Sequence, residues 1–239
     1  MNLRKNHEML LHFVMAFIGG YFGLYAIVAR NDLFGSAQTS NLIYLVQDIL
    51  GGRPLDFVIR IGALVLYSTA VVLSVWLPKH TAVNNKILSI LIDGGAAILL
   101  GFLPKDMNPV LGLYPIFFAM AFQWNSFPGA YGYNASCIFS TNNCRQIANA
   151  LTEYSITHEK KLLKKAWFFF GTVLCFHLGV AFSWLTHYFI GIRSVWLCVI
   201  PLAVSAVLIY WEAQLDKQPE PSVCKKIPAA VCIQVAEKH

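Results

Sequence analysis

The side chains best suited to chemistry in this sequence gather in one short polar stretch, residues 138–155, which lies between long apolar segments. When this stretch is placed on a helix at about 100° per residue, its polar side chains lie within an arc of roughly 100°. These side chains are Asn142, Arg145, Gln146, Asn149 and Glu153. The opposite face is apolar and carries Cys144, Ile147, Ala148 and Leu151. The pattern predicts a helix with one hydrated face and one apolar face.

Arg145 is the strongest candidate for contact with a ligand. A charged side chain at the bilayer centre costs at least about 2.5 to 3.5 kcal/mol, so it should face a cavity, a partner or another polar group. Together with the free N–H groups at the helix start near residues 141–143, its guanidinium would bind a carboxylate or a phosphate. The alternative is a structural ion pair with Asp48, Asp93 or Glu153.

Other polar side chains are candidates for contact with a solute or an ion. Asp93 interrupts an apolar run and is either a proton or cation site or the counter-ion of Arg145; Asp48 is a second coupling candidate. Some polar or aromatic residues either contact a solute or only join and anchor helices, because polar contacts between membrane helices are common. The candidates chosen for solute contact are Thr141, Asn142, Asn149, Asn41, Gln123 and Trp124.

The elements that must position these residues are those of a membrane protein. The 239 residues are 57% hydrophobic and only 13% charged, too few charges to cover a soluble globule of this size. Apolar runs of about 20 residues are continuous rather than alternating, which indicates membrane helices rather than barrel strands. The composition predicts an all-α, polytopic protein in contact with a lipid bilayer, and no interleaved basic and aromatic patch suggests nucleic acid.

Six apolar segments are predicted to cross the membrane, and two short polar helices lie between them. The crossings are residues 9–29, 55–77, 87–103, 108–124 with a kink at Pro115, 166–190 and 195–210. The polar helices are residues 138–155 and 35–50, and residues 125–134 cannot form a regular helix because Pro128, Gly129 and Gly132 interrupt them. The helical part of each stretch, about 15 to 16 residues, is about 23 Å long, shorter than a hydrocarbon core of about 30 Å.

The two halves of the chain follow the same plan. Offset by about a hundred residues, Thr39, Ser40 and Asn41 align with residues 141–143, and each half reads long helix, polar helix, long helix, long helix. The predicted units are residues 1–106, 107–212 and a polar tail, 213–239. If the polar helices are re-entrant or broken, the repeats are inverted and there are six crossings; if both cross, there are eight. Both topologies place the two termini in the cytoplasm, and the six-crossing topology also places the basic loops there.

The sequence favours a transporter over an enzyme. His158-Glu159 lacks the second histidine of a zinc protease motif, no nucleophile elbow or P-loop is present, and no cofactor or metal is expected. We expect a secondary transporter or facilitator of a small polar, anionic metabolite bound between the two repeats, with a homo-oligomer left open. The alternative is a membrane-embedded binding subunit that works with a separate energising complex.

Several short motifs resemble one known family. They are Gly20-Tyr21, Phe34, Thr39-Ser40-Asn41-Leu42, Ala119-Met120-Ala121-Phe122-Gln123 and Thr141-Asn142-Asn143. On these motifs nearly the whole chain resembles the YoaK family of bacterial inner-membrane proteins, a group classed as a domain of unknown function. The resemblance implies an integral, multi-pass inner-membrane protein of about six helices that is regarded as a transporter, without a substrate. Gly23 and Ala37 depart from the family pattern, which commonly has an acid and a histidine there, and Ser40 and Asn142 replace glycines.

Overall fold

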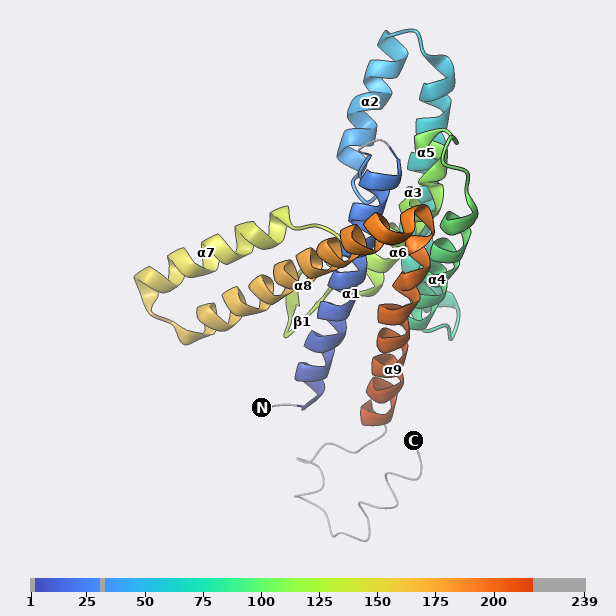
Figure 1. Ribbon diagram of the computed structural model, residues 1–239. Coiled ribbons are helices and arrows are strands. Elements are labelled where there is room, and N and C mark those ends of the chain that lie inside the picture. Colours follow the sequence, from blue (N-terminus) through green and yellow to red (C-terminus); the bar gives the residue numbers. More distant parts are fainter. Residues whose placement is uncertain (1–2, 31–32, 217–239) are drawn as a thin grey trace.

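The computed structural model describes residues 3–30 and 33–216, and this part of the chain is almost entirely helical (Figure 1). The helices of the first half are α1 (Leu3–Ala29), α2 (Gln38–Leu50), α3 (Pro54–His80) and α4 (Asn85–Phe102). Those of the second half are α5 (Pro109–Gly112), α6 (Tyr114–Ser126), α7 (Thr141–Thr157), α8 (Lys160–Ile190), the 3-10 helix η1 (Gly191–Cys198) and α9 (Val199–Asp216). A two-stranded ribbon, β1 (Gly129–Ala130) and β2 (Tyr133–Asn134), follows α6. The prediction of an all-α protein is confirmed.

Four stretches of the described residues are long and apolar enough to cross a membrane. They are Leu3–Ala29, Pro54–His80, Asn85–Phe102 and Lys160–Leu215, the last of which contains α8, η1 and most of α9. The single kinked helix predicted over residues 108–124 is instead two helices, α5 and α6. Pro115 lies in the first turn of α6, where its missing N–H does no harm, so it starts a helix rather than kinking one.

Two pairs of helices from different halves of the chain, α1 with α8 and α6 with α3, pack in parallel. Helices α1 and α8 run in the same direction, because Phe13 stacks near Phe168 with ring centroids 6.0 Å apart, and Tyr21 Oη lies 3.0 Å from Thr186 Oγ1. Helices α6 and α3 also run in the same direction. Tyr114 Oη donates to the carbonyl of Ile59 at 2.7 Å and Asn125 Nδ2 donates to Ser74 Oγ at 2.9 Å.

Two further pairs of helices, α4 with α9 and α1 with α6, pack in opposite directions. Lys86 Nζ at the start of α4 pairs with Glu212 Oε1 near the end of α9 at 2.6 Å, whereas Trp196 Nε1 just before α9 donates to the carbonyl of Ile98 near the end of α4 at 3.2 Å. Helices α1 and α6 are antiparallel as well. Gln123 Nε2 donates to the carbonyl of Met15 at 3.0 Å, and Arg30 Nη1 after α1 donates to the carbonyl of Pro104 at 2.6 Å.

The crossing of α1 and α8 depends on glycine. A Cβ atom at Gly20 would collide with the backbone carbonyl of Phe176, and a Cβ atom at Gly179 would collide with the carbonyl of Phe17. Glycine at both positions lets the two backbones touch, as small residues do between membrane helices. This contact holds α8, the helix that follows the polar helix α7, against α1.

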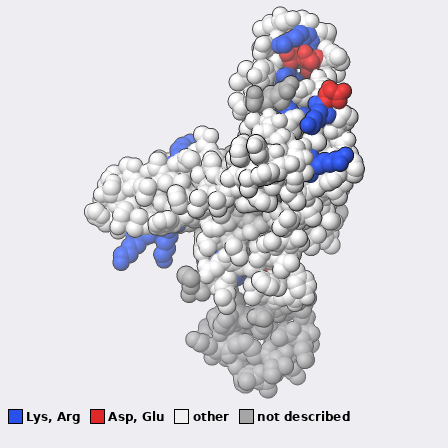
Figure 2. Space-filling view, in the orientation of Figure 1, with Lys and Arg blue, Asp and Glu red and all other residues white. Residues whose placement is uncertain are grey.

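The polar helices α2 and α7 each form a hairpin with the long helix that follows. Gly52, with φ of 67°, lies in the α2–α3 turn, and His158, with φ of 56°, ends α7 in the left-handed conformation. The two hairpins leave the bundle in different directions (Figure 1). On the face seen in Figure 2 most atoms are uncharged, and Lys and Arg gather on the α2–α3 hairpin and along the α7–α8 hairpin.

The predicted boundary between residues 106 and 107 lies in the loop between α4 and α5. The predicted polar tail, residues 213–239, begins inside α9, which continues to Asp216. The rest of that tail lies outside the described residues.

Candidate functional site

Both polar helices begin at the wall of one cavity. Its volume is about 930 Å³, within the range of about 300 to 1,000 Å³ that is usual for small-molecule sites. Side chains from α2, α3, α6, α7, α8 and the loops before the two polar helices line it. The lining residues are Phe34, Ala37, Gln38, Thr39, Leu42, Tyr67, Trp124, Phe139, Ser140, Thr141, Asn142, Arg145 and Phe176. The cavity therefore lies between the two elements that the sequence marks as polar.

The start of α7 is held by Asn143. This buried amide donates to the carbonyls of Ser136 at 2.8 Å and Phe139 at 3.0 Å, and it accepts the N–H of Ser136 at 3.1 Å. Three hydrogen bonds from one side chain fix the loop before α7 relative to the first turn of the helix. Asn143 was not predicted as a site residue. Its position in the run Thr141-Asn142-Asn143, at the start of a polar helix, could have indicated its role.

Arg145 lies one turn into α7, with its guanidinium on the cavity wall. Its Nη2 donates to Asn142 Oδ1 at 2.7 Å, and no carboxylate of the described residues lies within ion-pairing distance. An arginine carries five N–H donors, so this side chain keeps most of them for another acceptor. The structural ion pair with Asp48, Asp93 or Glu153, the alternative left open by the sequence, is not formed.

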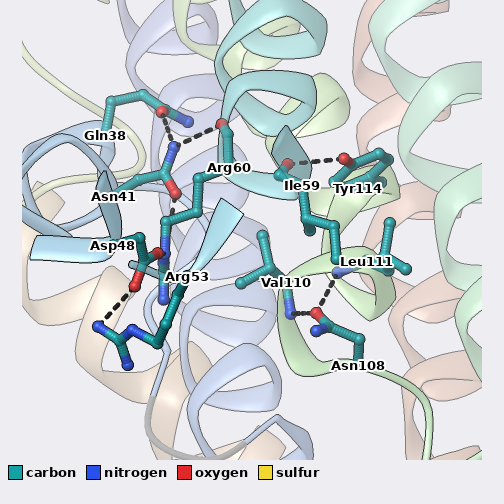
Figure 3. A network of polar contacts seen from close by, with 10 residues as sticks. All are labelled: Gln38, Asn41, Asp48, Arg53, Ile59, Arg60, Asn108, Val110, Leu111 and Tyr114. Carbon is teal, nitrogen blue, oxygen red and sulfur yellow. Dashed lines mark hydrogen bonds and ion pairs between the residues drawn. The ribbon is translucent and has the colours of Figure 1, made fainter. Parts of the chain in front are cut away.

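The start of α2 is held by a buried polar network with α3 (Figure 3). Asn41 Nδ2 donates to Gln38 Oε1 at 3.1 Å and to the carbonyl of Arg60 at 3.2 Å. Further along α2, Asp48 accepts from Arg60 Nε at 2.7 Å and from Arg53 Nη2 at 2.6 Å. The polar side of α2 therefore faces α3, and its apolar side chains point outward, as they should next to lipid.

Arg60 was missed from the sequence although it is the centre of this network. It lies within the apolar run 55–77, and an arginine in such a run is expected to face a partner at membrane depth. Besides pairing with Asp48, its guanidinium carbon lies 4.6 Å from the ring centroid of Tyr44. A lone arginine inside a predicted crossing was the signal that could have revealed it.

Neither polar helix has a side-chain cap at its start. No side chain of the residues preceding α2 and α7, Ala37 and Ser140, accepts a bond from the first-turn N–H groups. The Ser140 hydroxyl and the Gln38 amide nitrogen, both on the cavity wall, have no hydrogen-bond partner among the described residues. Uncapped N–H groups and the positive end of the helix dipole favour an anion, and here two helices direct them to one cavity.

The rest of the wall is aromatic. Trp124, at the end of α6, packs edge to face against Phe139 with ring centroids 5.2 Å apart. Phe34, Tyr67 and Phe176 come from three other parts of the chain. The cavity thus combines one cation and two helix starts with five aromatic rings.

The predicted site residues divide into two groups. Arg145, Asn142, Thr141 and Trp124 line the cavity together. The others lie elsewhere: Asn41 and Asp48 contact α3, Asn149 lies exposed further along α7, Gln123 is bonded to α1, and Asp93 is buried in α4.

Asp93 stands apart from the cavity and from Arg145. It is fully buried one turn after Ser89, and neither of its oxygens has a hydrogen-bond partner among the described residues. Across those same residues, no group of three or more His, Cys, Asp or Glu side chains is placed to hold a metal ion.

The predicted apolar face of α7 needs correction. Cys144, Ala148 and Leu151 are exposed, whereas Asn143 and Ala150 are buried. A helical wheel assumed that the apolar side chains pack inward, but a helix at a bilayer can turn apolar side chains outward and keep small or bonded ones inside. The side of α7 with Arg145, Asn149 and Glu153 lies away from the buried Ala150.

The sequence was compared with known families, proteins and structures. Residues 11–208 match the model of a family described as a protein of unknown function (DUF1275). No curated protein and no solved structure matches the sequence.

Proposed function

Because the chain belongs to this family of unknown function, DUF1275, we propose its activity from its own geometry: it is an integral membrane secondary transporter or facilitator of a small anionic metabolite. The metabolite binds in the cavity between α2 and α7. Arg145 contacts its negative group, and the first turns of both polar helices complete the anion site.

The observation that carries this proposal is the meeting of both polar helix starts with one unpaired arginine at a single cavity. An arginine at membrane depth is costly unless a partner or water offsets its charge. Here Asn142 is neutral and the described carboxylates lie out of reach, so the counter-charge is left to a ligand.

The packing of the helices supports two inverted repeats. If α1 is exchanged with α6, α2 with α7, α3 with α8 and α4 with α9, the packed pair α1–α8 becomes α6–α3, α2–α3 becomes α7–α8, and α4–α6 becomes α9–α1, while α1–α6 and α4–α9 map onto themselves. The antiparallel directions of α1 with α6 and of α4 with α9 turn the second half upside down relative to the first. Transporters with inverted repeats bind substrate between the repeats, at the starts of broken helices.

The proposed topology has six crossings, with α2 and α7 as half-helices. Helices α1, α3, α4, α8 and α9 provide five, and α5 with α6 provides the sixth. The start of α1 and the end of α9 lie at the same end of the bundle, whereas α8 begins at the tip of the hairpin that it forms with α7 (Figure 1) and runs in the same sense as α1. Its lysine-rich first turns then anchor in the cytoplasm, which together with the YoaK resemblance supports a bacterial inner membrane.

Uptake into proteoliposomes tests the proposal. Purified protein should carry radiolabelled organic anions into the vesicles, and Arg145→Gln should lower the initial rate at least about tenfold, because it removes the cation that holds the anion. Lys164→Gln is the matched control, since it removes an exposed positive charge outside the cavity. Equal uptake by wild type and Arg145→Gln would remove the anion site from the proposal.

The second candidate is a membrane-embedded binding subunit that depends on a separate energising complex. The same cavity would serve it, so the two differ only in whether the purified chain moves the solute. Arg145-dependent binding without uptake by the purified chain would select the binding subunit.

A further inference from the structure

The wall of the cavity between α2 and α7 has far more aromatic surface than a small inorganic anion can use. Phe34, Tyr67, Trp124, Phe139 and Phe176 come from five separate segments of the chain. Aromatic rings bind flat apolar groups through stacking and edge-to-face contacts, with centroids about 4.5 to 7 Å apart. Such a wall selects a ligand that has an apolar body.

The charge of the wall limits the ligand to one negative group. Among the lining residues Arg145 is the only one that ionises to a cation, and none is acidic. A guanidinium binds a single carboxylate through two parallel N–H···O bonds. A second or third negative charge would find no further cation on this wall, so the wall favours a ligand with a single negative group.

The size of the cavity agrees with a ligand that has more than a carboxylate. At about 930 Å³ it lies near the upper end of the range of about 300 to 1,000 Å³ for small-molecule sites. Acetate or phosphate would leave the aromatic rings uncovered. A ring attached to the carboxylate would cover them.

We infer that the ligand of this cavity is an aromatic monocarboxylate: its carboxylate pairs with Arg145 at the start of α7, and its ring lies among the aromatic side chains around Trp124. This inference rests on the proposed site between α2 and α7 and narrows it to one substrate class. Arg145 binds the carboxylate of the ligand, and Trp124 selects ligands by the shape of their apolar part. Compact polyanions are excluded by charge, and neutral aromatics are excluded because they leave the guanidinium unpaired.

Equilibrium binding to the purified full chain in detergent micelles tests the inference with five probes. They are phenylacetate, acetate, phosphate, phenylacetamide and palmitate. Phenylacetate should bind at least about tenfold more tightly than acetate, phosphate or phenylacetamide, because only phenylacetate satisfies both the cation and the rings. Palmitate has the same carboxylate but comes from the membrane, and it should not compete better than phenylacetate.

Two variants separate the roles of charge and ring. Arg145→Gln should weaken phenylacetate binding at least about tenfold and make it equal to phenylacetamide. Trp124→Leu should reduce the preference for phenylacetate over acetate about three- to tenfold, while the affinity for acetate stays the same. Trp184→Leu, an exposed tryptophan on α8 outside the cavity, is the control and should change neither.

The outcomes distinguish this inference from the proposed function. Arg145-dependent binding of phosphate tighter than phenylacetate would overturn the aromatic class and leave an anion site in place. Palmitate binding tighter than phenylacetate would overturn it in favour of a lipid-derived carboxylate. If Arg145→Gln changes the affinity of no probe, both this inference and the anion site fail. Tight phenylacetate binding without uptake would support the inference and contradict transport.

Discussion

The two hairpins of this protein contain polar helices of similar plan but use their polar side chains differently. In the α2–α3 hairpin, Asp48 and Asn41 are bonded to Arg60, so the polar side of α2 is satisfied by the protein itself. In the α7–α8 hairpin, the one hydrogen-bond partner of the Arg145 side chain among residues 3–30 and 33–216 is neutral, Asn142. The comparison teaches that one polar helix has its polar side chains satisfied by the protein, whereas the other carries an arginine whose counter-charge we propose to be a ligand.

The hairpins also differ in how they are attached. Helix α2 is joined to α3 by ion pairs, whereas α7 contacts α8 through apolar packing, with Ile147 against the cluster that contains Phe168 and Phe169, and α8 in turn touches α1 at the glycine crossing. Ion pairs and hydrogen bonds define one register, while apolar packing is less directional. Four substitutions test this difference, and they follow from the largest expected effect to the smallest.

Removal of Asp48 should have the largest effect. Asp48→Ala leaves the partly buried Arg60 without its carboxylate, and breaking one side of a buried pair costs about 3 to 5 kcal/mol of unfolding free energy. Reversible unfolding by SDS in mixed micelles measures this loss. Glu153→Ala on α7 is the matched control, because Glu153 is exposed and should change stability by less than about 0.5 kcal/mol. Equal losses in the two variants would contradict the distinction between the hairpins.

The glycine crossing should give the next effect. Gly20→Ala places a methyl group against the carbonyl of Phe176, so α1 and α8 must separate, at a cost of about 1 to 3 kcal/mol. Gly94→Ala serves as the control, because a Cβ atom at Gly94 meets nothing within 4 Å. The same SDS unfolding assay compares them. A Gly20→Ala protein as stable as Gly94→Ala would show that the two helices need no close approach.

Loss of the Asn143 side chain should lower both the affinity of the cavity for its ligand and the free energy of unfolding. Asn143→Ala leaves the buried N–H and C=O of Ser136 without partners, which costs about 1 to 3 kcal/mol. The start of α7 should also become less fixed, so phenylacetate affinity should fall together with stability. Thr141 lines the cavity but makes no hydrogen bond to that loop among the described residues, so Thr141→Ala should keep stability within about 0.5 kcal/mol. If Asn143→Ala bound phenylacetate with wild-type affinity, the hydrogen bonds of Asn143 would matter for stability and not for ligand binding.

Arg145→Gln should have the smallest effect on stability. Its guanidinium is exposed and makes one hydrogen bond, to Asn142, so unfolding free energy should change by less than about 0.5 kcal/mol. Ligand affinity should nevertheless fall, as described above. A large loss of stability would mean that Arg145 is a structural residue, and the contrast with Asp48 would disappear.

Much of the fold could be predicted from the sequence, because the relevant signals are local. Continuous apolar runs predicted the helices, and the polar stretches 35–50 and 138–155 predicted α2 and α7, because hydropathy and helical period depend only on neighbouring residues. Pro115 shows the limit even at this level. A proline inside an apolar run either kinks one helix or starts another, and tertiary packing decides which of the two occurs.

The sequence by itself determined which side chains are polar within an apolar chain, and hence that Arg145, Asp48 and Asp93 need an explanation. Only the tertiary structure decided which of them are satisfied by the protein, because a partner such as Arg60 is 12 residues away from Asp48 in sequence and lies on another helix. The same holds for the cavity, whose wall joins residues from Phe34 to Phe176. Charge and hydropathy belong to single residues, whereas pairing and enclosure depend on distances that folding alone sets.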